Sequence, residues 1–288
     1  MSTKCGIFWF TVAVMVATFI SCGGERNDSS HEEQVQLLTD SLPADTLTQE
    51  EEEELSICEE STQAIDGIFN DFLFAYLHNR SLRRERTACP LLLEHPGRQA
   101  EMLEQFDPEF EFGFLFGEYF TTLYGNVQQM QAEDDNELEE DSIVSLQRIN
   151  LNDGTIRNFQ FLREKGRWKL TAIREATFQD DDLNDFLCFY ANFCTDSLFQ
   201  AQTIANPLRI VLQDPEDDEG YIDGTIDADQ WQSFCPEVPS GIISNIRKGQ
   251  NYGGHRIVLR KSGLSNGLQE VFTFTKEKGN WRLTRYEN

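Results

Sequence analysis

Tyrosine and aspartate residues recur at matching places in the chain and could together carry out proton transfer. Asp71 lies five residues before Tyr76, and Asp185 lies five residues before Tyr190. A carboxylate near a tyrosine can act as a general base beside a hydrogen-bond donor. Each aspartate also follows an asparagine, so a structural role, as a helix-face hydrogen bond or a solvent-exposed group, is the interpretation that we favour. Further residues of suitable chemistry are His78, Tyr119 and Tyr124.

Other catalytic and metal-binding patterns are absent from the sequence. The four histidines stand at positions 31, 78, 95 and 255, which is not the spacing of a metal site. No Gly-x-Ser-x-Gly elbow, phosphate-binding glycine loop or dinucleotide fingerprint occurs. The acidic stretch at 214–220 lacks the ordered ligand spacing of a calcium loop. We therefore predict no cofactor, no metal site and no catalytic residue.

The charge of the chain restricts its partners. The 288 residues include 24 lysines and arginines against 50 aspartates and glutamates, so the formal net charge is −26. A nucleic-acid partner is not expected, because binding a phosphate backbone requires clustered lysine and arginine. Electrostatic adhesion to anionic lipid is disfavoured for the same reason. Hydrophobic residues make up 39% of the chain, enough to bury a core, and the length suggests two domains.

The N-terminus has the pattern of an export signal followed by a lipid anchor. Lys4 precedes an uncharged, largely apolar stretch at 6–20, which is shorter than a membrane-spanning helix. The sequence Phe-Ile-Ser-Cys at 19–22 resembles the lipobox of bacterial lipoproteins, in which the chain is cut before a lipidated cysteine. We predict a signal peptide at 1–21, lipidation of Cys22 and a location in the bacterial cell envelope, at the outer membrane. The alternative is an ordinary signal or an uncleaved anchor with a chance cysteine. Residues 22–55, with a run of five glutamates at 50–54, are predicted to form a flexible acidic spacer.

The remaining chain contains one sequence pattern twice, and we call the two occurrences the first and second copies. Residues 159–171 and 272–284 are identical at eight of 13 positions, at an offset of 113. Residues 69–73 and 183–187 repeat an aromatic or aliphatic residue followed by Asn-Asp-Phe-Leu. Internal repeats of this length indicate a duplicated structural unit. We predict one repeat at 56–178 and a second at 179–288.

Each copy is predicted to begin with helices and to end with strands. Apolar residues at helical spacing indicate an opening helix: Ile65, Ile68, Phe69, Phe72 and Tyr76 in the first copy and Leu183, Phe186, Leu187 and Tyr190 in the second. A shorter helix should follow and end before Pro90 and Pro207. Predicted strands cover 143–151, 155–163 and 167–174, and then 256–261, 268–275 and 280–286. The alternating phenylalanines at 110, 112, 114 and 116 predict one more strand with an apolar face.

This order of elements gives an α+β fold in which a curved antiparallel sheet wraps a long N-terminal helix. The closing hairpins of both copies share Gly-x-Trp-[Lys/Arg]-Leu, with the tryptophans Trp168 and Trp281. The pattern resembles the nuclear transport factor 2-like superfamily, twice in succession, within an uncharacterised family of Bacteroidota lipoproteins. The resemblance implies a conical cavity in each copy. Within such a cavity we expect Tyr76, Phe120, Tyr190 and Trp231 to contribute to the lining.

Cysteines outside the signal peptide form no Cys-x-x-Cys motif. An exported chain can form disulfides, and Cys194 with Cys235 is the pairing that we expect if one forms. Cys188 stands where the first copy has Phe74, so we predict a buried apolar residue there.

Three functional hypotheses follow from these patterns. The leading one is a non-enzymatic envelope lipoprotein that binds a small apolar ligand, a peptide or another envelope protein. The superfamily resemblance also implies an alternative, an isomerase or dehydratase that uses a tyrosine and an aspartate in one cavity, although no residue pattern matches those enzymes. The third hypothesis is a structural protein whose cavities are filled by its own side chains.

Overall fold

The computed structural model describes residues 65–106, 111–134, 142–234, 236–249, 252–264 and 267–288. Elements of the first copy are α2 (Phe69–His78), α3 (Arg80–Glu85), β1 (Thr87–Glu94), β2 (Glu101–Leu103), η1 (Gly113–Leu115), β3 (Tyr119–Tyr124), α5 (Val127–Asp134), β4 (Ile143–Asn150), β5 (Thr155–Glu164), β6 (Arg167–Thr177) and η2 (Phe178–Asp180). Elements of the second copy are α6 (Asn184–Phe193), α7 (Ser197–Gln202), β7 (Ile204–Asp214), β8 (Asp217–Ile226), α8 (Trp231–Phe234), β9 (Ile242–Arg247), β10 (Arg256–Gly263), β11 (Gln269–Glu277) and β12 (Asn280–Glu287). The α+β class is therefore confirmed.

The strands form two six-stranded sheets, in the orders β2-β1-β6-β5-β4-β9 and β3-β10-β11-β12-β7-β8. Both are mixed sheets, because β1 runs parallel to β6 and β7 runs parallel to β12. The prediction of antiparallel sheets is wrong at these pairs. The reason is that other strands separate β1 from β6, and β7 from β12, along the chain, so neither parallel pair is joined by a hairpin, which would make its strands antiparallel.

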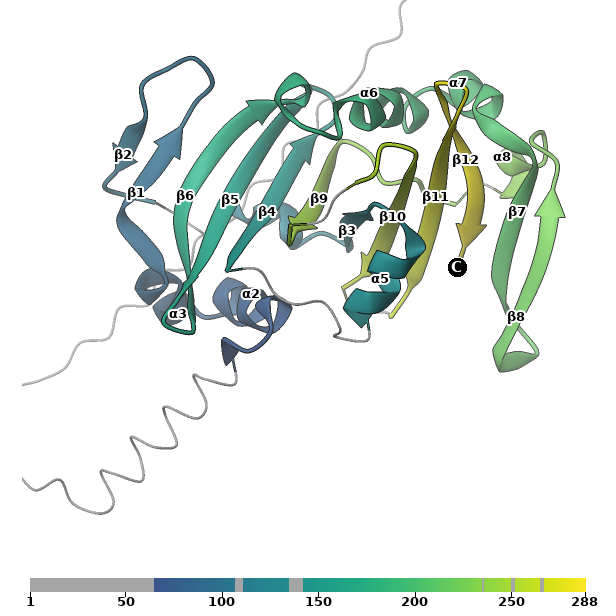
Figure 1. Cartoon of the computed structure of the whole chain (residues 1–288). Helices are drawn as coiled ribbons and strands as arrows, with labels where there is room; N and C mark the ends of the chain where they lie inside the picture. The colour runs from purple at the N-terminus through teal and green to yellow at the C-terminus, as the bar shows by residue number, and fades with distance from the viewer. Residues whose placement is uncertain (1–64, 107–110, 135–141, 235, 250–251, 265–266) are drawn as a thin grey trace, which may run out of the picture. The chain divides into compact units, whose positions relative to one another are not determined.

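Each sheet contains one strand from the other copy (Figure 1). Strand β9 of the second copy pairs antiparallel with β4 of the first, from Ser145 opposite Arg247 to Asn150 opposite Ile242. Strand β3 of the first copy pairs antiparallel with β10 of the second. The two copies therefore exchange equivalent strands, and neither sheet is complete without the other copy. The boundary predicted at 178/179 stays a prediction about the sequence repeat.

The exchanged strands cross at Thr121 and Ser244, which are linked by reciprocal hydrogen bonds. The Thr121 N–H donates to Ser244 Oγ at 2.8 Å, and the Ser244 N–H donates to Thr121 Oγ1 at 3.0 Å. Each hydroxyl in turn donates to the carbonyl of the other residue. Next to this crossing, buried Asn245 accepts the Leu123 N–H at 2.9 Å and donates to Gln147. Buried backbone groups need such partners, so these side chains make the crossing of two strands from different sheets tolerable.

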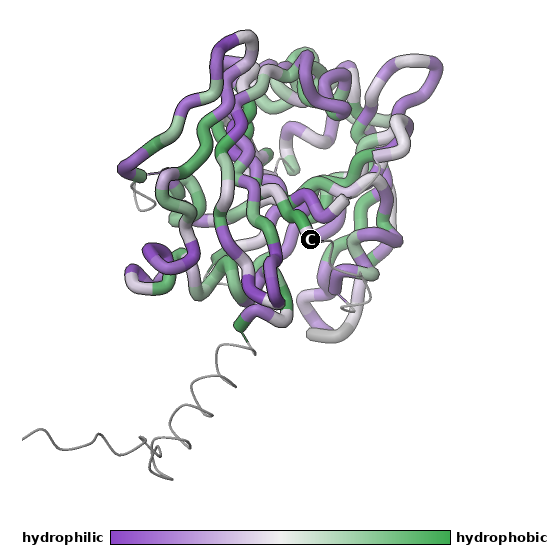
Figure 2. Tube along the Cα trace, turned by 60° about the vertical axis from the view of Figure 1, so that its left-hand side comes forward, coloured by the Kyte–Doolittle hydropathy of each residue, from purple (hydrophilic) through white to green (hydrophobic). Residues whose placement is uncertain are grey.

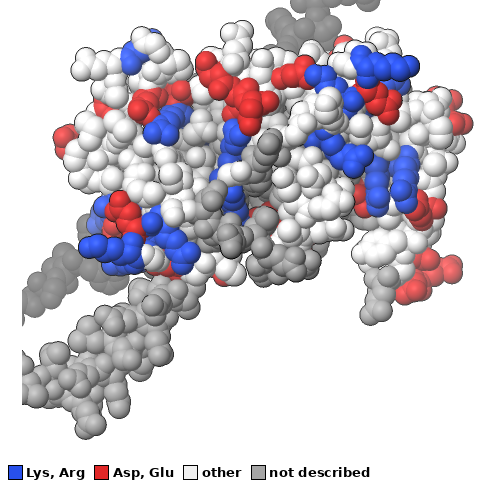
Figure 3. Space-filling model, in the orientation of Figure 1, with Lys and Arg blue, Asp and Glu red and all other residues white. Residues whose placement is uncertain are grey.

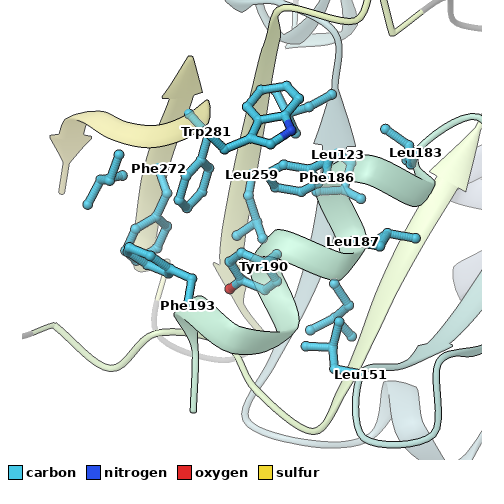
Figure 4. Packing of buried hydrophobic residues seen from close by; sticks show 14 of the residues in the cluster. Leu123, Leu151, Leu183, Phe186, Leu187, Tyr190, Phe193, Leu259, Phe272 and Trp281 are labelled. Carbon is cyan, nitrogen blue, oxygen red and sulfur yellow. The ribbon is translucent and has the colours of Figure 1, made fainter. Parts of the chain in front are cut away.

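The two largest hydrophobic cores among the described residues lie under the two sheets, and each contains a residue from the exchanged strand of the other copy. In one, α6 contributes Phe186, Leu187, Tyr190 and Phe193, and Leu123 of the first copy packs among them (Figure 4). In the other, α2 contributes Phe69, Phe72 and Tyr76, and Ile246 of the second copy packs among them. The predicted opening helices are confirmed, with Phe69, Phe72 and Tyr76 buried in α2 and Phe186, Leu187 and Tyr190 buried in α6, although each helix has only ten residues. The prediction is wrong for Ile68, which precedes α2 and is exposed, because the helix begins one residue later.

The closing hairpins follow the sequence closely. Lys165 and Gly166 turn with φ of 51° and 78°, and Lys278 and Gly279 with φ of 49° and 86°. Two successive residues with positive φ make the tight turn that suits the twist of paired strands. Buried and more exposed residues alternate along the strands that follow. Figure 2 shows hydrophobic and hydrophilic residues interspersed along the chain trace. The predicted strands at the end of both copies are confirmed within one to three residues.

Two predictions about local structure are wrong. Residues 111–118, which were expected to continue a strand of alternating phenylalanines, contain a short 3-10 helix at Gly113–Leu115 instead. Gly113 and Gly117 interrupt the aromatic run and weaken any strand there, because glycine has no side chain to pack. Cys188 lies on the exposed side of α6, with its sulfur 3.3 Å from Asn184 Oδ1, and is not buried.

The part of the chain with described coordinates has no helix that is long and apolar enough to cross a membrane.

Candidate functional site

An apolar pocket of about 180 Å³ opens where the exchanged strands pass helix α2. Aliphatic and aromatic side chains form most of its wall: Leu73, Phe74, Leu77, Leu115, Phe120, Leu146, Ile246 and Leu264. Its polar lining consists of Asn70, Thr122, Glu133, Ser244 and Arg260. Residues from α2, η1, β3, α5, β4, β9 and β10 therefore meet here. The pocket exists only because strands of both copies come together.

Glu133, at the end of α5, is the centre of a charged cluster on the polar side of the pocket. Its Oε1 accepts from Lys248 Nζ at 2.9 Å and from Asn70 Nδ2 at 3.4 Å. Its Oε2 accepts a short hydrogen bond from the Tyr124 hydroxyl and a longer one, at 3.4 Å, from Arg260. The side chains of Glu133, Lys248 and Arg260 are each at most 9% exposed. Opposite charges at this depth hold one another in place.

Arg260 extends this cluster and leaves one donor unused. One of its terminal nitrogens bonds to Asp134 and the other to Glu133, and its guanidinium lies 5.0 Å from the centre of the Tyr124 ring. Its Nε is buried and has no hydrogen-bond partner among the described residues. A buried N–H without a partner costs stability, about 1–3 kcal/mol.

The pKa values of Glu133 and Tyr124 are displaced in opposite directions. Burial alone would raise the pKa of Glu133, but Lys248, the hydrogen bond from Tyr124 and Arg260 together hold it below its usual range. Burial raises the pKa of the Tyr124 hydroxyl, against the opposing effect of Arg260. Glu133 is thus a weak base and Tyr124 a weak acid. Acid–base catalysis near neutral pH works best with pKa values close to 7, which neither group has.

The four residues predicted to line a cavity are not brought together. Phe120 lines the pocket. Tyr76 and Tyr190 are fully buried in separate cores; the Tyr76 hydroxyl lies 2.6 Å from Thr87 Oγ1, and the Tyr190 hydroxyl donates to the Pro239 carbonyl at 2.8 Å. Trp231 is fully buried, with Nε1 donating to Gln200 Oε1 at 3.0 Å. These three side chains do not line the pocket.

Most of the other residues considered for proton transfer make contacts that stabilise the fold or are exposed to solvent. Asp185 accepts from Lys276 Nζ at 2.7 Å and from Trp281 Nε1 at 2.6 Å, so it ties α6 to the closing hairpin. The hydrogen bond from Lys276 is the main reason why the pKa of Asp185 is lowered. Asp71 is exposed, and His78 Nδ1 lies 2.8 Å from the Phe74 carbonyl oxygen. Within the described ranges, no group of three or more histidines, cysteines, aspartates or glutamates could hold a metal ion.

Predictions on two cysteines fall outside the described residues. Cys22, the predicted lipidation site, and Cys235, the predicted partner of Cys194, both lie there. The Cys194 sulfur is 3.5 Å from the Ala191 carbonyl oxygen, and burial raises its pKa to about 11. Both the lipidation and the disulfide stay predictions.

No sequence pattern predicted that Glu133, Lys248 and Arg260 form a cluster. Glu133 belongs to an acidic stretch of the kind that is usually exposed to solvent. Its two cationic partners are 115 and 127 residues away in the chain. Only the strand exchange brings them to one place.

Comparison with known proteins gives the family of the chain. The family model described as "Domain of unknown function (DUF4348)" matches residues 48–288. The chain belongs to this family. A crystal structure of an ntf2-like protein from Bacteroides fragilis is similar to the DUF4348 chain, with 29% sequence identity and a TM-score of 0.67. The match covers 77% of this chain and 96% of that one. No curated protein matches.

The predicted resemblance to nuclear transport factor 2-like proteins is thus confirmed for the DUF4348 chain. Its fold has a helix packed on a mixed sheet in each copy, and the family description assigns no activity. The function must be inferred from the pocket itself.

Proposed function

We propose that this chain is a non-enzymatic binding protein for a small, mostly apolar ligand that carries one hydrogen-bond acceptor. The observation that carries the proposal is the apolar pocket at the strand crossing, whose few polar lining residues include the hydrogen-bond donor Arg260. Pockets with an apolar wall and a few polar groups are typical ligand sites. The volume of about 180 Å³ is below the roughly 300–1,000 Å³ of sites for drug-sized molecules. The ligand, or the part that enters, is therefore small.

The charge balance of the polar side supports an uncharged acceptor. Glu133 and Asp134 face Lys248 and Arg260, so two negative groups stand against two positive ones. A charged ligand group would disturb this balance in a site that is poorly solvated. A carbonyl or ether oxygen fits better, because it accepts the Arg260 N–H without adding charge.

The titratable groups of the chain support ligand binding without catalysis more than they support a proton-transfer enzyme. Glu133 is held ionised by its cationic neighbours, and Tyr124 is held protonated by burial. The hydroxyls of Tyr76 and Tyr190, which the enzymatic hypothesis requires, bond to Thr87 and Pro239 instead of to a carboxylate.

The pocket is tested by a substitution that fills it. Leu77→Trp should place an indole ring in the pocket and displace a bound ligand, because Leu77 lies on the wall of the pocket. Native mass spectrometry of the full chain, purified gently from an envelope-containing lysate, should show a discrete added mass that is lost on denaturation. We expect this added mass to be absent from the Leu77→Trp variant.

Leu198→Trp is the matched control. Leu198 is 71% exposed on α7 and does not line the pocket, so the same substitution there should leave the added mass unchanged. An added mass that persists in Leu77→Trp would place the ligand elsewhere. A bare mass in the unmodified protein, with no binding of added apolar compounds, would favour the structural hypothesis.

We further propose that the chain works in the bacterial cell envelope, tethered to the outer membrane through a lipid on Cys22. The support is the pattern of an apolar stretch followed by Phe-Ile-Ser-Cys and an acidic spacer. Cys22→Ser should abolish incorporation of an alkyne-tagged fatty acid and shift the chain out of the membrane fraction. Equal labelling of Cys22→Ser and the unmodified chain would contradict the anchor.

A further inference from the structure

A second hollow, of about 610 Å³, lies beside helix α3 and has the opposite character to the pocket. Arg80, Arg83 and Arg84 of α3 line one side of it. The apolar residues Leu103 and Phe106 line another part, and Glu104 is the only carboxylate among the lining residues that the structure describes. Basic side chains gather over α3 in the space-filling view, at the lower left of Figure 3. In a chain of net charge −26, this is a local positive surface.

Helical geometry explains why the three arginines share one side. Positions i, i+3 and i+4 of a helix project from the same face. Like charges at this spacing repel one another, at a cost of about 0.2–0.5 kcal/mol for each pair. The guanidinium of Arg83 is held by the Leu77 carbonyl. Arg80 and Arg84 are exposed and form no ion pair with any described residue. Their charges are therefore available to an external anion.

The second copy shows that the fold does not need these arginines. Asn79 caps α3 by accepting from the N–H groups of Ser81 and Leu82, and Asp196 caps α7 in the same way. Aligning the two caps sets Arg80, Arg83 and Arg84 opposite the uncharged residues Ser197, Gln200 and Ala201. The same short helix therefore packs without a basic face. The arginines add a property that belongs to the first copy alone.

We propose that the hollow beside α3 binds the phosphate monoester group of a small organic molecule. The described part of the lining carries three arginines and one glutamate, and this basic character suits the charge of about −1.5 to −2 on a phosphate monoester. Guanidinium groups bind phosphate oxygens through paired hydrogen bonds. Leu103 and Phe106 offer an apolar surface to the organic part. The volume falls within the roughly 300–1,000 Å³ of small-molecule sites.

The overall negative charge of the chain does not prevent this binding. Charges are screened over about 8 Å at physiological ionic strength, so a ligand in the hollow senses mainly the arginines that line it. The long-range repulsion lowers the association rate more than it changes the final contacts. Binding should therefore weaken when salt is added, because the attraction is partly exposed to solvent.

Calorimetric titration of the full chain tests the proposal with three probes: inorganic phosphate, phenyl phosphate and a short-chain soluble phosphatidic acid. Phenyl phosphate should bind in a saturable manner and more tightly than inorganic phosphate, because its ring can contact Leu103 and Phe106. Tighter binding of the phosphatidic acid than of phenyl phosphate would identify a lipid headgroup as the source of the phosphate. The reverse order would identify a soluble organic phosphate.

Arg80→Ala/Arg84→Ala should weaken the binding of phenyl phosphate by about tenfold for each arginine removed. The control is Arg98→Ala/Arg282→Ala, which removes the same charge from exposed positions outside the hollow. The control should bind as the unmodified chain does. Saturable binding that both double variants weaken equally would overturn the proposal. So would the absence of saturable binding of all three probes to a chain whose thermal unfolding shows that it is folded.

Discussion

Asp66→Ala is expected to lower the free energy of unfolding by about 3–5 kcal/mol, because it removes the buried counter-ion of Arg86 and leaves only the exposed Glu85, 3.5 Å from its Nε. Asp66 is 1% exposed and accepts two hydrogen bonds from Arg86, at 2.9 and 3.1 Å. Its Oδ1 also accepts the Trp168 N–H at 2.9 Å. Arg86 in turn donates to the Trp168 carbonyl at 3.2 Å. The pair thus ties the segment before α2 to the start of β6.

Urea unfolding followed by circular dichroism measures this loss. Asp71→Ala is the control, because Asp71 is exposed in the first turn of α2, and it should cost less than about 1 kcal/mol. Asp66→Leu combined with Arg86→Met should recover part of the loss, since the unpaired charge is removed as well. A loss in Asp66→Ala no larger than in Asp71→Ala would mean that the ion pair does not hold these segments together.

The repeated fold could be predicted from the sequence because its strongest signals are local. The aromatic residues of α2 and α6 recur at helical spacing, and the Gly-x-Trp hairpins fix both the turn and the buried face of the strands beside it. A hairpin joins neighbours in sequence, so its pairing needs no long-range information. The same local signals gave the α+β class.

The strand exchange could not be predicted, because a strand pattern does not specify its partner. Residues Tyr119–Tyr124 and Ile242–Arg247 each have a run of buried residues, which suits either sheet. The choice is made by Thr121, Ser244 and Asn245, polar residues that are buried at the crossing. Their hydrogen bonds join residues more than 120 positions apart. In the sequence alone, such residues are indistinguishable from polar residues on a solvent-exposed face of a strand.

The candidate site depends on that exchange, and for this reason the site residues predicted from the sequence lie mostly elsewhere. Tyr76, Tyr190 and Trp231 were expected in two cavities, one in each copy, but they fill the cores beneath the sheets. The pocket instead lies between elements of the two copies, and only Phe120 among the predicted residues reaches it. A sequence duplication predicts that the two copies have similar folds. It contains no information about the surface where the copies meet.

Glu133→Gln is expected to lower the free energy of unfolding at pH 7 by about 2–4 kcal/mol. Glutamine keeps the size of the side chain, and its oxygen can still accept from Asn70 while its amide nitrogen donates to the Tyr124 oxygen. It removes the negative charge that faces Lys248 and Arg260, both of which are buried. The same substitution should also weaken ligand binding, because Arg260 on the pocket wall would keep its ion pair with Asp134 but lose the one with Glu133. Glu164→Gln, at an exposed position on β5 without an ion pair to the described residues, is the control.

The pH dependence of this loss distinguishes a charge effect from a packing effect. The pKa of Glu133 in the folded chain is lower than in the unfolded chain, so its ionised form stabilises the fold. That contribution is complete above the unfolded pKa, roughly 4.3. It is lost as the pH falls through the lower folded pKa. The difference in unfolding free energy between the unmodified chain and Glu133→Gln should therefore be constant from neutral pH down to about pH 5 and then shrink. A difference that stays the same at acid pH would show that Glu133 acts through its shape, and that the cluster beside the pocket does not depend on its charge.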